Sequence, residues 1–264
     1  MSQPDLLDRY KAKRNFAKTA EPAGEIAATS GNLFIVQKHD ATRLHWDLRL
    51  EVDGGLKSWA GTRGPSANPD DKRLAVRTED HPMAYATFEG TIPEEEYGGG
   101  TVMLWDRGTW APIAGKSAKD LEQGHLHFTL KGERMTGEWI LIRMKPRPGE
   151  KRANWLLRKT EDQYAKPGQD LVDRALTSVL TGRTMDAIAG DPAGSHSLAD
   201  KKGKAFTAIM SEAASHNAAL VKKPKTKTSA KLPQFRPVQL ATLVDAVPAG
   251  NAWMHEIKFD GYRA

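Results

Sequence analysis

The stretch TRLHWDLRLEVDGG, Thr42 to Gly55, carries metal-binding and phosphate-binding residue types at alternate positions. One parity is apolar, and the other parity presents His45, Asp47, Arg49 and Glu51. A period of two predicts a β-strand with an apolar face and a face of imidazole, carboxylate and guanidinium groups. Divalent metals bind His and Asp, and Arg binds phosphate oxygens in a forked geometry. This face therefore has the residue types for metal-assisted phosphoester chemistry.

Two further strands are expected to add to the same concavity. His39 closes an earlier strand, and Arg73, Arg77, Glu79 and His81 share one parity later in the chain. A His/His/Asp set would leave open positions on a metal such as Mn²⁺ or Zn²⁺. Arginines would hold phosphate oxygens, and a histidine could donate a proton to a leaving oxygen. Together these groups are the equipment of phosphoryl-ester hydrolysis.

A plainer interpretation remains open, because a polar face of this kind can be the salt-bridged exterior of an antiparallel sheet. The segment HLHF also places His125 and His127 on one strand face, but no acid or arginine follows at the same parity. We assign that pair to an ordinary strand surface. Six tryptophans are expected in the barrel core and rim rather than as base-stacking platforms: Trp46, Trp59, Trp105, Trp110, Trp139 and Trp155.

Composition limits the class of protein and its partners. The 264 residues are 39% hydrophobic and 27% charged, and no apolar run approaches the ~20 residues of a membrane span. Met1 to Ala20 lacks a hydrophobic signal segment, so a cytoplasmic protein is expected. With no cysteine, any metal must be bound by His, Asp or Glu. The net charge of +6 favours polyanionic partners.

Strand patterns dominate from Leu33 to about Lys159, and Asp53-Gly54 is a strong hairpin signal. The predicted fold is mainly β, a barrel with short flanking helices and an irregular N-terminal arm. Asp170 and Thr184 could cap one or two short helices. The predicted divisions are an arm (1–30), a β-barrel (31–166), a helical extension (167–193), a Lys/Ala/Ser-rich linker (194–233) and a final ordered segment (234–264).

Three segments resemble the 3′-phosphoesterase domain of bacterial DNA ligase D: FIVQKHDATRLHWDLRLEVDGGLKSWAGTRGPS, KRLAVRTEDHPMAYATFEGTIP and EYGGGTVMLWDRGTW. The resemblance covers roughly residues 8–160. It implies a β-barrel with a polar cavity, whose ligands point inward onto one manganese ion. It also implies removal of a 3′-terminal ribonucleoside and then of the 3′-phosphate, in bacterial non-homologous end joining. The expected substrate is the 3′ end of DNA at primer-template or break junctions.

Several residues match the family's site positions. The resemblance implies metal ligands at His39, His45 and Asp47, and phosphate or DNA contacts at Arg49, Arg63, Arg73 and His81. Further active-site positions fall on Glu79 and Tyr85, and the arm positions Arg14 and Glu21 would support ribonucleoside removal. The sequence departs from the family at Asn15, Arg63 and Glu95, where Asp, Lys and Gly are usual.

The tail EIKFDGYRA resembles the nucleotide-binding motif of ATP-dependent DNA ligases, with Lys258 at the position of the nucleophile. Only Arg263 and Ala264 follow Tyr262, so we expect a truncated ligase domain without ligase activity. The expected protein is a nucleoid-associated monomer, with Ku and a separate polymerase or ligase as candidate partners. The alternative is a non-catalytic DNA-binding or scaffold module left by truncation of a multidomain ligase.

Overall fold

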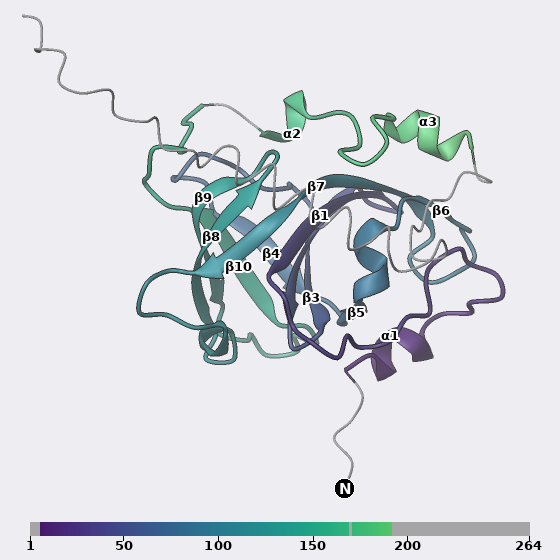
Figure 1. The fold of residues 1–264 in the computed structure, drawn as a ribbon, viewed down its shortest axis with the longest axis horizontal. Coiled ribbons are helices and arrows are strands. Elements are labelled where there is room, and N and C mark those ends of the chain that lie inside the picture. Colours follow the sequence, from purple (N-terminus) through teal and green to yellow (C-terminus); the bar gives the residue numbers. More distant parts are fainter. Residues whose placement is uncertain (1–5, 169–170, 192–264) are drawn as a thin grey trace, which may run out of the picture. The chain divides into compact units, whose positions relative to one another are not determined.

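The computed structural model describes residues 6–168 and 171–191. They belong to the first of two compact units, residues 1–222 and 223–264. Antiparallel strands form one sheet in the order β1-β2-β3-β4-β10-β9-β8-β7-β6, and β5 pairs with β3. A pairing of β1 with β7 closes eight of them into a barrel (Figure 1), so the predicted mainly β barrel is confirmed. The strands are β1 (Leu33–Asp40), β2 (His45–Val52), β3 (Gly55–Gly61), β4 (Arg73–Arg77), β5 (His81–Pro82), β6 (Gly90–Ile92), β7 (Gly100–Pro112), β8 (His125–Gly132), β9 (Thr136–Arg143) and β10 (Asn154–Lys159).

The predicted hairpin joins β2 to β3 at Asp53-Gly54. Both turn residues have positive φ, 54° and 76°, as a two-residue type I′ turn requires. A Cβ at Gly54 would lie 2.3 Å from the carbonyl oxygen of Ala27, where the end of the arm crosses the hairpin. Glycine is therefore needed at this position both for its conformation and for the close approach of the arm.

The barrel interior is filled by apolar and aromatic side chains from all eight closing strands. Phe34 and Val36 of β1 meet Leu48 and Leu50 of β2 there. The six tryptophans predicted for the core and rim are all buried in this cluster. A small barrel closed in this way has a packed interior without room for a polar cavity.

The expected inward orientation of the polar row is therefore wrong with respect to the barrel. Alternation along β2 sends Trp46, Leu48 and Leu50 inward, so Asp47 and Arg49 point to the outer face. That outer face is nevertheless buried, with Asp47 and Arg49 only 6% and 3% exposed. A second layer of chain covers it, so the polar cavity lies outside the barrel wall and beneath that layer.

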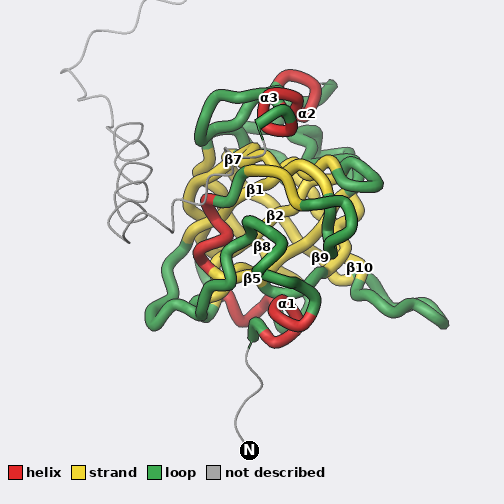
Figure 2. Tube along the Cα trace, turned by 90° about the vertical axis from the view of Figure 1, so that its right-hand side faces the viewer, coloured by secondary structure: helices red, strands yellow, loops and turns green. Residues whose placement is uncertain are grey.

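The N-terminal arm forms part of this second layer (Figure 2). It contains helix α1 (Asp8–Ala12), which the sequence analysis missed because it is a single turn without a side-chain cap. Leu7 and Tyr10 are fully buried, and Tyr10 packs in a second apolar cluster with Ile35, Leu56 and residues of the 3₁₀ helix η1 (Met83–Thr87). Residues 6–30 are thus packed on the barrel rather than forming a disordered tail.

Short helices follow the barrel, as predicted. They are α2 (Leu171–Arg174) and α3 (Met185–Ala189), and both views place them on the side of the barrel opposite α1 (Figures 1 and 2). Thr184 caps α3 by accepting a hydrogen bond from the amide of Ala187 at 3.2 Å, whereas Asp170 lies outside the described residues. A second 3₁₀ helix is η2 (Ala118–Leu121). No described helix is long and apolar enough to span a membrane. The predicted domain boundaries stay predictions.

Candidate functional site

Strand register brings three metal-ligand types together on the outer face. β1 and β2 pair His39 with His45 and Gln37 with Asp47, so these side chains stand side by side. One nitrogen of each imidazole and one Asp47 oxygen all lie within 4.8 Å of one another. Across residues 6–168 and 171–191, this is the one group of three such side chains close enough to share an ion.

The protonation of these groups suits a cation. Burial lowers the pKa of His39 to about 4, against the opposing effect of Asp47, so its imidazole is neutral at neutral pH. The buried Nε2 of His39 has no hydrogen-bond partner among the described residues. His45 Nδ1 lies 2.8 Å from the carbonyl oxygen of Arg43, which leaves Nε2 free, 3.7 Å from Asp47 Oδ2. Two imidazoles and a carboxylate fit Mn²⁺, Zn²⁺ or similar ions.

Arg49 connects this trio to the other buried polar groups of the site. Its guanidinium donates to Asp47 Oδ2 at 3.0 Å and to Gln37 Oε1 at 2.8 Å. The same group donates to Ser58 Oγ at 2.8 Å and lies 2.9 Å from His81 Nδ1. Because all these partners are buried, the guanidinium has a fixed orientation directly beside the metal-ligand group.

His81 lies in a positive and apolar environment. Burial, together with Arg49 and Arg14, lowers the pKa of His81 well below its ordinary value. Its Nδ1 lies 3.0 Å from the carbonyl oxygen of Glu79, and its Nε2 lies 3.3 Å from Arg14 Nη2. A neutral imidazole has one acceptor nitrogen: Nδ1 accepts from Arg49 in one tautomer, and in the other Nδ1 donates to Glu79 while Nε2 accepts from Arg14. The Tyr85 ring packs edge-on against this imidazole at 4.8 Å between centroids.

The arm contributes charged groups to the same place. Arg14 Nε donates to Glu21 at 2.8 Å, and Arg14 Nη1 donates to Glu79 at 3.2 Å. Lys13 also donates to Glu79, at 2.9 Å. Burial opposes ionisation of Glu79, but Lys13 and Arg14 outweigh it and lower the pKa of this carboxyl. The arm is therefore fastened to the barrel by ion pairs that face the site.

Most of these groups line one cavity of about 370 Å³. Of the predicted site residues, the structure brings together Arg14, Glu21, His39, His45, Asp47, Arg49, Glu79, His81 and Tyr85. Glu51 lies apart from them, since its carboxylate accepts hydrogen bonds from the amides of Gly31 and Leu33. That carboxylate fixes the start of β1.

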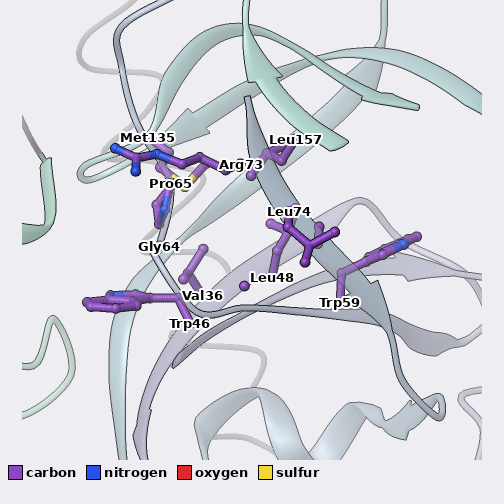
Figure 3. Close-up of a pocket in the computed structure, with 12 residues that line it drawn as sticks. Val36, Trp46, Leu48, Trp59, Gly64, Pro65, Arg73, Leu74, Met135 and Leu157 are labelled. Atoms are coloured by element: carbon purple, nitrogen blue, oxygen red, sulfur yellow. The ribbon is translucent and has the colours of Figure 1, made fainter. Parts of the chain in front are cut away.

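Arg73 and Arg63 lie elsewhere. Arg73 projects into an apolar pocket beside Pro65 and Met135 (Figure 3), where it pairs with Asp71 at 3.0 Å. The expected shared face is wrong because Ala75, of the same parity as Arg73, points into the barrel interior. The chain leaves β4 at Arg77, and the irregular residues 78–80 then carry Glu79 and His81 to the outer face. Arg63 is exposed and does not line the cavity.

Four residues that the sequence analysis did not select also line or border the cavity. They are Lys13, Arg43, Tyr97 and Arg152. Tyr97 comes from the glycine-rich stretch before β7, and Lys13 donates to its hydroxyl at 3.0 Å. The basic loop KPRPGEKR, residues 145–152, was the available signal for Arg152. No local pattern pointed to Lys13, because only tertiary packing brings the arm to this cavity.

The departures from the family pattern do not alter the cavity lining. Asn15 is exposed, and its side chain accepts a hydrogen bond from the Ala17 amide at 3.1 Å. Glu95 is exposed in a turn, and its φ is not positive, so glycine is not required there. His125 is exposed and His127 pairs with Glu138 at 3.2 Å, as expected for a strand surface. Lys258 lies outside the described residues.

Comparison with known proteins agrees with this geometry. Residues 37–143 match the DNA Ligase D 3'-phosphoesterase domain. A "Multifunctional non-homologous end joining protein LigD" of Pseudomonas aeruginosa is 41% identical over 262 residues, 97% of this chain and 28% of that protein. The Mycobacterium tuberculosis "Multifunctional non-homologous end joining DNA repair protein LigD" is 41% identical over 161 residues, 60% of this chain and 20% of that protein.

The chain spans between 20% and 28% of the length of these curated relatives. The matched residues 37–143 include the whole metal-ligand group, Arg49 and His81. They also include strands β2 to β9 of the barrel that positions these residues. Over residues 37–143, this chain thus matches the family of DNA ligase D 3′-phosphoesterase domains.

Proposed function

We propose that this protein is a metal-dependent phosphoesterase that heals DNA 3′ ends. In this proposal it removes a terminal ribonucleoside and then the remaining 3′-phosphate, leaving a 3′-hydroxyl. The observation that carries the proposal is the close grouping of His39, His45 and Asp47 beside Arg49 and His81 in one cavity. The names of the relatives further support a role in non-homologous end joining, and we propose that this role is in the bacterial cytoplasm.

His39, His45 and Asp47 would hold the ion, which we propose to be manganese. When bound, such an ion supplies Lewis-acid stabilisation of phosphate oxygens and activation of water. The open positions of a three-ligand site would face the cavity. Asp47 has a second task, because its contact with Arg49 aligns the guanidinium beside the metal ligands.

Arg49 and His81 would bind the phosphate. The Arg49 guanidinium is buried and already oriented, so it can stabilise developing negative charge without reorganisation. His81 is neutral in the free protein and lines the cavity. A bound phosphate would add negative charge beside it, favour the protonated imidazole and allow proton donation to the leaving oxygen.

The arm would serve the ribonucleoside step. Arg14 lies within hydrogen-bond distance of both Glu79 and His81, which places a positive charge between the phosphate position and the carboxylates. Glu21 orients Arg14 through its contact at 2.8 Å. Tyr85 supports His81 from the side. These residues would position the terminal ribose while Arg49 holds the phosphate.

A labelled primer-template with a 3′-phosphate tests this proposal. With Mn²⁺ we expect phosphate release that stops on addition of chelator and is abolished in His45→Ala and Asp47→Ala. His127→Ala is the matched control, since this histidine lies on the outer surface of β8 and should leave release unchanged. Near-normal release in the His45 or Asp47 variant would contradict the site.

The same assay tests the alternative, a non-catalytic DNA-binding or scaffold module. That module would bind DNA in a salt-dependent way without metal-stimulated trimming. Association with Ku, or with a separate polymerase or ligase, remains a proposal that pull-down experiments can address. Sedimentation would test the proposed monomer.

A further inference from the structure

We propose that the outer face of β3, β4 and β10 is a track for the primer strand, with Arg152 at its far end. The track would hold backbone phosphates upstream of the 3′ end while the metal-ligand group engages the end itself. This inference rests on the proposed function, because it assigns the direction in which that site receives its DNA.

Strand register defines the track. Asp47 pairs with Ala60 of β3, Ala60 pairs with Val76 of β4, and Val76 pairs with Asn154 of β10. Directly paired residues lie on the same face of a sheet, so these residues form one row on the outer face. Ala60 and Val76 both line the cavity, which gives it a smooth, uncharged floor. Three strand spacings of about 4.8 Å put β10 about 14 Å from Asp47.

Two exposed cations flank this floor: Arg152 lies in the loop before β10, and Arg43 lies in the turn between β1 and β2. Arg152 and Arg43 both line the cavity and are exposed. Neither guanidinium has a hydrogen bond or ion pair with any residue in 6–168 or 171–191. The loop of residues 144–153 that carries Arg152 holds four basic side chains and one acid, Glu150. Glu150 accepts hydrogen bonds from the Arg147 amide and from the Asn154 side chain within the loop region.

Where the N-terminal arm borders the cavity, the charges are paired within the protein. There Lys13 and Arg14 are already bound to Glu79 and Glu21, at 2.8–3.2 Å. Gly98, beside Tyr97, also lines the cavity there, and a Cβ built on it would lie 3.9 Å from the His39 ring. Unpaired cations suit a chain of backbone phosphates, whereas a region whose charges are already paired suits one terminal nucleoside. The geometry therefore directs the upstream strand toward Arg152 and the terminal ribonucleoside toward Tyr97.

DNA binding by the full chain tests the track without requiring catalysis. The probe is a primer-template with a 3′-hydroxyl, titrated at several salt concentrations. Arg152→Ala should make the slope of log affinity against log salt shallower by about 1, and Arg43→Ala/Arg152→Ala by about 2. Between about 50 and 200 mM salt, the wild type should thus lose about fourfold more affinity than Arg152→Ala.

Lys116→Ala is the control, because this lysine is exposed on the loop after β7 and does not line the cavity. It should leave the slope unchanged. Equal slopes for the wild type and the Arg43/Arg152 double variant would overturn the track. So would an equal reduction of the slope in Lys116→Ala, since the binding would then reflect overall charge.

Substrate length tests the direction. At the duplex rise of 3.4 Å per nucleotide, about 14 Å corresponds to about four nucleotides. For 3′-phosphorylated hairpin duplexes of increasing stem length, kcat/KM should rise up to about this number of base pairs and then level off, and Arg152→Ala should remove the rise through KM. A length-independent wild type would overturn the direction. Absence of release from every substrate would instead refute the proposed function, while the binding slopes would still decide the track.

Discussion

Replacing Arg49 by lysine keeps the positive charge but removes the forked geometry, so it tests whether the orientation of the guanidinium matters. Arg49 is 3% exposed and contacts Gln37, Ser58, His81 and Asp47 at 2.8–3.0 Å. One ammonium nitrogen occupies one point and cannot reach partners placed around a planar fork. At least two of these buried polar groups would therefore lose their partner.

The expected cost follows from those lost contacts. An unsatisfied buried polar group costs about 1–3 kcal/mol, and more when it is charged, as Asp47 is. Two of them give about 3 kcal/mol, a large part of a typical unfolding free energy of about 5–15 kcal/mol. With an m value of about 2 kcal/mol/M in urea, the midpoint should fall by about 1.5 M. Phosphate release should fall at least about 10²-fold, because oriented stabilisation is lost.

Arg107→Lys is the matched control. Arg107 also donates to a carboxylate at 2.8 Å, that of Glu133, but both side chains are partly exposed, at 24% and 42%. Exposed pairs contribute at most about 1 kcal/mol, so its midpoint should change little. Equal midpoint shifts in urea for the two variants would refute the reasoning that burial and geometry, rather than charge, give Arg49 its importance.

Three other predictions follow from individual carboxylates. Asp47→Asn should abolish the rise in melting temperature on addition of Mn²⁺, and a retained rise would contradict the metal site. Burial raises the pKa of Asp106 to about 7, so stability should fall by up to about 4 kcal/mol as pH rises from 4 through 7. Asp106→Asn should make the unfolding free energy from urea titrations depend less on pH. An unchanged dependence of the unfolding free energy on pH would exclude the Asp106 carboxyl as its cause. Glu21→Gln removes one of the two carboxylate partners of Arg14, so hydrogen exchange should quicken in residues 6–30 but not in the barrel; an unchanged arm would argue against this ion pair as its fastening.

Local patterns were informative where the chain is regular. Alternation along β2 separates Trp46 and Leu48 from Asp47 and Arg49, and this separation survives in the fold. The Asp53-Gly54 signal also held, because a two-residue turn with positive φ is a property of its own residues. These predictions succeeded because pleating and turn geometry are local.

The predicted shared face of residues 73–81 was wrong beyond the end of β4. Counting by twos from Arg73 to His81 assumed one continuous strand, but β4 ends at Arg77. The irregular residues that follow rotate the chain, so Arg73 faces an apolar pocket while Glu79 and His81 face the cavity. Strand ends depend on pairing partners distant in sequence, here the β10 residues that pair with β4.

Alternation establishes that β2 has an apolar and a polar side, but it does not say which side a barrel encloses. The pairing of β1 with β7 determines which side is enclosed, because it closes the sheet around the aromatic face. Burial of the polar side came from the arm, whose Tyr10 and Arg14 are anchored by contacts with residues more than 60 positions away. Residue types and their spacing thus define the chemistry that is available. Long-range packing defines the compartment in which that chemistry could act, because the burial of a side chain depends on neighbours that are distant in sequence.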